Sequence, residues 1–293
     1  YAAVLSLLAV IAAGVSIGVQ QVNFGVDFVG GSSMEISTPG QAPLAQIRQD
    51  LSAMGAADAQ VQGVGGGARA SIRFRSVAGQ APDAAAAFVA QKLAQEIPGL
   101  TVSGESTVGA KVSGELIWGG IEALGVALFL MLLYIWFRFQ LQFGLGAILA
   151  LAHDILLTIG FLSITRIEVS MTSIAALLTV IGYSMNEKVI SFDRLRENLR
   201  KYKTTPLREV INLSENERLS RTIITGLTAL LALSGSMFNP ASALFSLTAT
   251  MAFGILIGTY SSIYVALPVI LLWGVRRDDE EAAPIKLQPA RGR

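Results

Sequence analysis

Residues 116–137 read LIWGGIEALGVALFLMLLYIWF and contain one charged side chain, that of Glu122. A helix needs about 20 mainly apolar residues to cross the roughly 30 Å hydrocarbon core of a bilayer, so this stretch predicts a membrane-spanning helix. The whole chain agrees: 52% of its 293 residues are hydrophobic, 15% are charged, and its mean hydropathy is +0.56. Soluble domains carry about 25% charged residues, so we expect a membrane protein.

Five further segments have the length and composition of spans, and they are 1–19, 143–164, 169–192, 222–238 and 243–273. The first begins without a basic leader, which favours a span over a cleaved signal peptide. The last is long for one crossing, so we expect it to tilt, protrude or break near Pro268. The sequence therefore predicts a polytopic α-helical membrane protein with six transmembrane helices.

Basic residues collect on one side of these spans. Residues 193–208 hold six of them, Arg138 follows the second span, and Arg276 and Arg277 follow the sixth. Because loops rich in Lys and Arg stay in the cytoplasm, both termini are expected there. The predicted units are then a first helix (1–19), an outward domain (20–114), the other five helices (115–275) and a cytoplasmic tail (276–293).

The outward segment 20–114 is polar and long enough to fold as a unit. Its pattern reads strand, helix, strand, strand, helix, strand, which matches the βαββαβ ferredoxin-like arrangement. Since it has no His and no Cys, a binding or lever role fits it better than catalysis. We expect a small α+β ferredoxin-like domain outside the membrane.

The composition also excludes several kinds of site. The chain has no Cys and one His, which rules out disulfides, thiolate ligands and a multi-histidine metal centre within it. Its net charge of +1 gives no general attraction to nucleic acid. We therefore expect no metal, no cofactor and no nucleic-acid partner.

Ionisable side chains lie inside the predicted spans, where each costs at least about 2.5–3.5 kcal/mol. They favour a proton path, in which Glu187 supplies the carboxylate and Arg221 a fixed positive charge on the next span. Asn186 is a neutral neighbour that could hold water, and His153 with Asp154 offers a second titratable pair. The predicted relay is therefore Glu187, Arg221, Asn186, Asp154 and His153.

Structural interpretations of the same residues remain open. Lys188 could reach the cytoplasmic headgroups, His153 and Asp154 could be a packing pair, and Glu187 with Arg221 could be a static ion pair. Glu122 could lie at the outer interface. Residues 193–221 combine basic side chains with an apolar face, which predicts an interfacial amphipathic helical hairpin.

Four strings together resemble one family. They are FGVDFVGG at 24–31, IGYSMNEKVISFDRLRENLR at 181–200, LSRTIITGLTAL at 219–230 and GTYSSIYVA at 258–266. They resemble the SecF family, the smaller partner in the SecD–SecF accessory complex of bacterial protein export. The resemblance runs in order along essentially the whole chain, and a SecF half of a fused SecD–SecF chain would look the same.

The resemblance implies a six-helix bundle of the resistance-nodulation-division (RND) type in the bacterial inner membrane. It implies that the complex uses the proton motive force to pull on a preprotein outside the membrane, in a step that follows the SecA motor and the SecYEG channel. SecD and YajC are the further partners that it implies. It assigns proton transport to Glu187 and Arg221. The family usually has Asn-Asp-Thr where this chain has Asn186-Glu187-Lys188.

Within 24–31, the resemblance implies a loop in which Asp27 packs against the bundle, while Gly25, Gly30 and Gly31 suit backbone turns. Two other functions remain open: half of an RND-type exporter of small molecules or lipids, and a purely structural subunit that stabilises a partner. An enzyme is not expected, because His153 and Asp154 have no evident nucleophile beside them.

Overall fold

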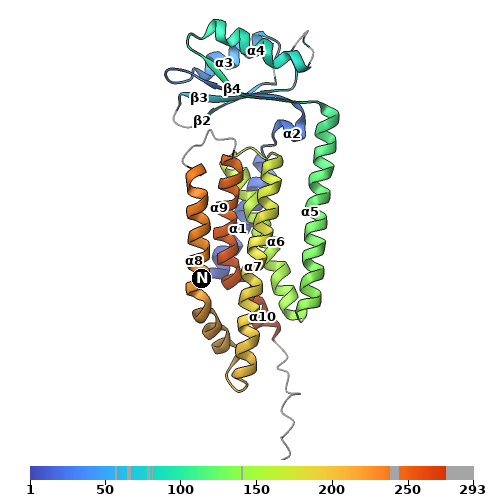
Figure 1. The fold of residues 1–293 in the computed structure, drawn as a ribbon, viewed down its shortest axis with the longest axis vertical. Helices are drawn as coiled ribbons and strands as arrows, with labels where there is room; N and C mark the ends of the chain where they lie inside the picture. Colours follow the sequence, from blue (N-terminus) through green and yellow to red (C-terminus); the bar gives the residue numbers. More distant parts are fainter. Residues whose placement is uncertain are drawn as a thin grey trace, which may run out of the picture.

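The computed structural model describes residues 1–56, 58–64, 67–77, 80, 82–139, 141–237 and 244–274. Long helices stand side by side, and a small domain with a sheet covers one end of them (Figure 1). The expected tail, 276–293, lies outside the described residues. The long helices are α1 (Ala2–Gln20), α5 (Ala110–Arg138), α6 (Leu141–Thr165), α7 (Met171–Lys201), α8 (Leu207–Met237) and α9 (Phe245–Ser261).

Five helical stretches in the described part of the chain are long and apolar enough to cross a membrane. They are Ala2–Gln20, Lys111–Arg138, Leu141–Thr165, Leu207–Met237 and Phe245–Trp273. The helix α7 is as long as α8 but more polar, because charged residues fill its second half. It packs against α6, α8 and α9. The chain is therefore a multi-pass membrane protein whose most polar long helix lies inside the bundle.

The last span contains a local change of helix type. A π-helical segment, η1 (Ser262–Ala266), joins α9 to α10 (Leu267–Trp273), and Pro268 lies in the first turn of α10. Proline cannot donate a backbone hydrogen bond and collides with the carbonyl four residues earlier. A wider turn placed before it accommodates both effects. The helical stretch Phe245–Trp273 continues through this segment, so near Pro268 the helix type changes and the helix does not end.

The expected hairpin 193–221 is the continuation of two long helices. The helix α7 runs to Lys201, and α8 begins at Leu207 after Pro206. Apolar residues of both ends, among them Leu195, Leu199 and Val210, join the core of the bundle. The two helices therefore extend past the predicted ends of their spans without a break.

The small domain contains α2 (Val26–Val29), β1 (Gly31–Ser37), α3 (Leu44–Ala53), β2 (Gln60–Val64), β3 (Arg69–Phe74), α4 (Pro82–Glu96) and β4 (Thr101–Val108). Its strands are antiparallel in the order β2-β3-β1-β4. Both α3 and α4 cover the sheet face that points away from the bundle (Figure 1). Alternate residues of β1, Met34 and Ile36, are fully buried in the core that these helices close.

The loop 24–31 joins this domain to the bundle. The Gly25 amide donates to the Val169 carbonyl at 2.8 Å, and the Asp27 carboxylate accepts the Met171 amide at 2.9 Å. Met171 begins α7, so Asp27 supplies a hydrogen bond and a negative charge to the positive end of that helix. Gly31 has φ +117°, and a Cβ there would lie 2.5 Å from the Phe74 carbonyl oxygen. This loop attaches the domain directly to the first turn of α7.

Charged side chains strengthen the same joint. Arg73, from β3, lies 3.6 Å from the Glu168 carboxylate and donates to the Phe24 carbonyl at 3.1 Å. Burial raises the pKa of the Glu168 carboxyl, and the positive charge of Arg73 offsets part of that rise. A Cβ on Gly25 would collide with the same carboxylate, so a larger residue there would require the Glu168 side chain to shift.

Small residues bring α1 and α6 into contact. A Cβ added to Gly160 would overlap Ala13, and the hydroxyls of Ser16 and Ser163 share a hydrogen bond at 2.9 Å. Close backbone approach through small residues is a usual way to pack helices in lipid, where burial of apolar groups gives little advantage.

We expect Gly160→Leu to separate α1 from α6, because overpacking of this kind costs about 1–3 kcal/mol. The measurement is disulfide formation between cysteines introduced at Ser16 and Ser163 in a chain without native cysteine. Cross-linking should be efficient with Gly160 and largely lost with leucine. Gly182→Leu is the control, because a Cβ there meets no atom within 4 Å. Equal loss in both variants would contradict this packing.

Candidate functional site

Two clusters of buried charge flank α7. Glu187 and Lys188 are neighbours on this helix, with exposed fractions of 2% and 0%. Their side chains leave the helix in different directions: Lys188 reaches α6 and α9, and Glu187 reaches α8. Adjacent helical residues point about 100° apart, so one helix serves two separate partners.

The first cluster pairs Lys188 with Asp154 of α6 at 2.8 Å, and both side chains are completely buried. The hydroxyls of Ser184 and Ser261 donate to the same carboxylate oxygen at 2.5 and 2.7 Å, and both also accept hydrogen bonds from the Lys188 ammonium. The interpretation of Lys188 as reaching the headgroups is wrong. The ammonium is held inside the bundle, because Asp154 would otherwise be an unpaired buried charge.

His153 extends this cluster toward α1. Its Nδ1 lies 3.0 Å from the second oxygen of Asp154, and its ring stacks on Tyr260. The Tyr260 hydroxyl donates to the carbonyl of Ala2 at 2.9 Å. The buried Nε2 of His153 has no hydrogen-bond partner in the described part of the chain. The Nδ1 atom of His153 therefore contacts the Asp154 carboxylate, while Nε2 makes no hydrogen bond to a described residue.

The second cluster joins α7 to α8. The Arg218 guanidinium lies 3.2 Å from Glu187 and 2.7 Å from Glu215, so two carboxylates share one cation. Burial is nearly complete, with exposed fractions of 4% for Arg218 and 8% for Glu215. Hydroxyl groups complete the hydrogen bonding of the three charges, and they belong to Ser191, Thr222 and Ser262.

The expected partner of Glu187 was therefore wrong. Arg221 lies on the exposed face of α8, and Arg218, three residues earlier, occupies the place expected for it. The spacing of Ser214, Glu215 and Arg218, continued by buried Thr222 and Gly226, follows one helical face. That periodicity is the signal in the sequence that could have identified Arg218 and Glu215.

The remaining expected residues lie apart from the clusters. Asn186 is exposed on α7, and Glu122 is exposed on α5. The hydroxyls that hydrogen-bond these charges belong to Ser184, Ser191, Ser261 and Ser262. They were not among the expected residues, because a serine in a helix carries no signal by itself. Among the described residues, no group of three or more His, Cys, Asp or Glu side chains could hold a metal ion.

Together the clusters contain three carboxyl groups, two basic side chains and one imidazole, all away from bulk water. In such surroundings an ion pair is held by strong Coulomb attraction and depends on its hydrogen bonds. A proton delivered to Asp154 or Glu187 would cancel that attraction. The contacts of α7 with α6 and with α8 therefore include buried ion pairs.

We expect Lys188→Met to destabilise the protein by about 3–5 kcal/mol, because Asp154 would be left as an unpaired buried charge. The double variant with Asp154→Asn should recover most of this loss. Thermal unfolding of the purified protein in detergent measures both effects. The matched control is Lys201→Met, an exposed lysine at the end of the same helix. Equal unfolding temperatures for Lys188→Met and Lys201→Met would refute the structural role of the pair.

Comparison with known proteins assigns the family. Residues 89–276 match the family model for "Protein export membrane protein SecD/SecF, C-terminal", and residues 15–38 match the "SecD/SecF GG Motif". The second match contains the loop that binds the start of α7.

Named relatives agree. The protein translocase subunit SecF of Rhodobacter capsulatus is 48% identical over 64% of this chain and 56% of its own length. The SecF of Cereibacter sphaeroides is 41% identical over 87% of this chain and 81% of its own. The crystal structure of SecDF from Thermus thermophilus, a translocon-associated membrane protein, superposes with a TM-score of 0.83 at 32% identity. It covers 92% of this chain and 37% of that longer one. The resemblance noted in the sequence is thereby confirmed: the chain belongs to the SecF family of protein translocase subunits.

Proposed function

We propose that this chain is an accessory subunit of the Sec translocase that uses the proton motive force to promote late stages of preprotein export. The observation that carries the proposal is the cluster of Glu187, Glu215 and Arg218, buried between α7 and α8. Charges inside a membrane bundle are costly and typically mark an ion or proton pathway. The role needs no covalent catalysis by the chain.

In the proposed cycle, Glu187 exchanges a proton while Arg218 remains charged. Protonation removes one of the two negative charges on the guanidinium and weakens the attraction between α7 and α8. Moving one charge through 100 mV supplies about 2.3 kcal/mol, which is enough to shift a two-state equilibrium severalfold. Asp154 and His153 form a second protonatable pair on another side of α7, and Asn186 borders the pathway at its exposed side.

The helix α7 is the proposed mechanical link. Its first turn receives the Asp27 carboxylate, and Val169 just before it hydrogen-bonds Asn23 and Gly25. The proton-binding residues lie about four turns further along the same rigid helix. A tilt of α7 driven by a change at Glu187 would therefore move the attached domain, which supports a lever role for residues 20–114.

We propose six membrane crossings with α7 as the fourth. Its 31 residues span about 45 Å, which exceeds the hydrocarbon thickness. Basic residues at the ends of α5 and α7 support cytoplasmic termini and a periplasmic domain 20–114 in the bacterial inner membrane. The domain's element order and its strand order, β2-β3-β1-β4, support the ferredoxin-like βαββαβ assignment.

We propose SecD, as a separate or fused chain, as the principal partner. The solved SecDF chain is matched over 37% of its length, and transporters built from repeats place their pathway between two halves. Arg221 stays in the proposed pathway for this reason: it lies on an exposed face of α8 that a partner could cover. SecYEG, YajC and a preprotein delivered by SecA complete the proposed assembly.

We expect Glu187→Gln to abolish proton-dependent export while the complex still assembles, because Arg218 keeps Glu215 as its counter-ion. The measurement is preprotein export into membrane vesicles with and without a proton gradient. Glu122→Gln is the control, since it makes the same change in an exposed carboxylate of α5. Gradient-stimulated export that survives in Glu187→Gln would favour a purely structural subunit.

Substitutions of Arg218 and Arg221 should separate the stability of this chain from the coupling of export to the proton gradient. Arg218→Gln leaves two buried carboxylates without their cation, so we expect a loss of about 3–5 kcal/mol and a lower unfolding temperature. Arg221→Gln should leave the unfolding temperature of this chain unchanged, because its side chain is exposed, and should impair export only in the complex. A lower unfolding temperature for Arg221→Gln than for Arg218→Gln would overturn the assignment of Arg218 as the buried partner.

A further inference from the structure

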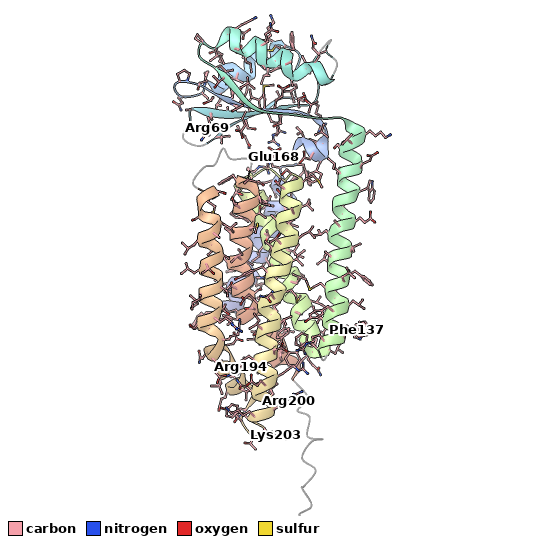
Figure 2. The ribbon with its side chains drawn as sticks, in the orientation of Figure 1. Arg69, Phe137, Glu168, Arg194, Arg200 and Lys203 are labelled. Atoms are coloured by element: carbon pink, nitrogen blue, oxygen red, sulfur yellow. The ribbon has the colours of Figure 1, made fainter. Side chains whose placement is uncertain are left out.

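A charged pocket lies at the end of the bundle opposite the small domain. It encloses about 630 Å³ and is lined by Arg138 of α5 and by five residues of α7, namely Asp193, Arg196, Glu197, Arg200 and Lys201. Figure 2 labels Arg200 and Phe137 at this end of the molecule, far from Glu168 at the joint with the small domain.

Both acids that line the pocket are already paired. Asp193 binds Arg138 at 2.8 Å, and Glu197 binds Arg194 at 2.6 Å. The other basic side chains of the pocket, those of Arg196, Arg200 and Lys201, have no ion pair with a described acidic residue. Four basic and two acidic side chains line the pocket, so positive charge is in excess there.

An aromatic platform holds two of the guanidinium groups in place. Arg138 and Arg196 lie over the ring of Phe139, at 4.9 and 5.7 Å from its centre. That ring is itself fixed, because it is 7% exposed and packs against Phe143 and Phe192. Stacking on this fixed ring therefore restricts the positions of both guanidinium groups.

The pocket also lies at the depth of lipid headgroups. Trp136 and Phe137 directly precede Arg138 and are 81% and 82% exposed, and Leu141 across the turn is 76% exposed. Tryptophan and other aromatic residues at the end of a span mark the boundary between hydrocarbon and headgroups. A ligand in this pocket would therefore have its anionic group at Arg196, Arg200 and Lys201 and its apolar part in the adjoining hydrocarbon, at the depth of Trp136.

We propose that this pocket binds the phosphate of an anionic phospholipid whose acyl chains lie along α5. Guanidinium groups pair well with phosphate oxygens, and basic pockets at the cytoplasmic ends of membrane helices suit anionic headgroups. The site is separate from both buried charge clusters and does not depend on the proposed proton-driven function.

The test uses the full chain in mixed vesicles and the fluorescence of Trp136 as a local reporter. The chain has three tryptophans, so Trp118→Phe and Trp273→Phe leave Trp136 alone. Brominated phosphatidylglycerol should quench Trp136 more strongly than brominated phosphatidylcholine at the same mole fraction. A second reporter with only Trp118, near the other end of α5, should show no such preference.

Substitutions in the pocket test whether it is responsible for the preference for the anionic lipid. Each basic residue near an anionic membrane strengthens binding roughly fivefold. Arg196→Gln, Arg200→Gln and Lys201→Gln together should therefore weaken binding of the anionic lipid on the order of a hundredfold and remove the preference. The matched control removes the same charge from the small domain, with Arg69→Gln, Arg75→Gln and Lys92→Gln, and should leave the preference intact.

Three outcomes would overturn the proposal. Equal quenching by the two lipids at Trp136 would mean that no anionic lipid is selected. An equal loss in the control variant would mean that only the net charge of the protein matters. Displacement of the lipid preference by inorganic phosphate at constant ionic strength would identify a site for free phosphate. A preference confined to Trp136 and lost only in the pocket variant supports the lipid site.

Discussion

The bundle depends on the neutralisation of two adjacent charged residues on one helix. Glu187 and Lys188 are both buried, and each would be prohibitively costly there without a counter-ion. Asp154 of α6 supplies one partner and Arg218 of α8 the other, while Ser261 and Ser262 bring α9 and η1 to the same level. These ion pairs and hydrogen bonds set the positions of four elements around α7, which apolar contact between helices in lipid would leave poorly specified.

The same helix connects the membrane interior to the small domain. Its first turn is bound by Asp27, and the loop before it pairs with residues 23–25. A domain carried on a loop alone could move independently of the bundle. Here the attachment is made of backbone hydrogen bonds and the Arg73–Glu168 ion pair, so a change in the direction of α7 would be passed to the sheet.

Much of the fold could be predicted from the sequence. Long apolar runs identified the five helical stretches of the described residues that could cross a membrane. Periodicity located the elements of the small domain, because both signals are local. The site was predicted in part: Glu187, Asp154 and His153 lie in buried clusters, whereas Arg221 and Asn186 lie on exposed surfaces. Arg218 and Arg221 are three residues apart, so their side chains leave α8 in directions that differ by about 60°. To choose between them, one must know which side of α8 faces α7.

The sequence by itself determined that the chain is a membrane protein with buried charge and a separate polar domain. Length, hydropathy and the position of ionisable residues along the chain are enough for those conclusions. Only the tertiary structure decided which charges meet: it paired Lys188 with Asp154 and Arg218 with two carboxylates. The physical reason is that an ion pair inside a bundle depends on the facing of separate helices, and that facing is fixed by contacts among residues distant in the chain.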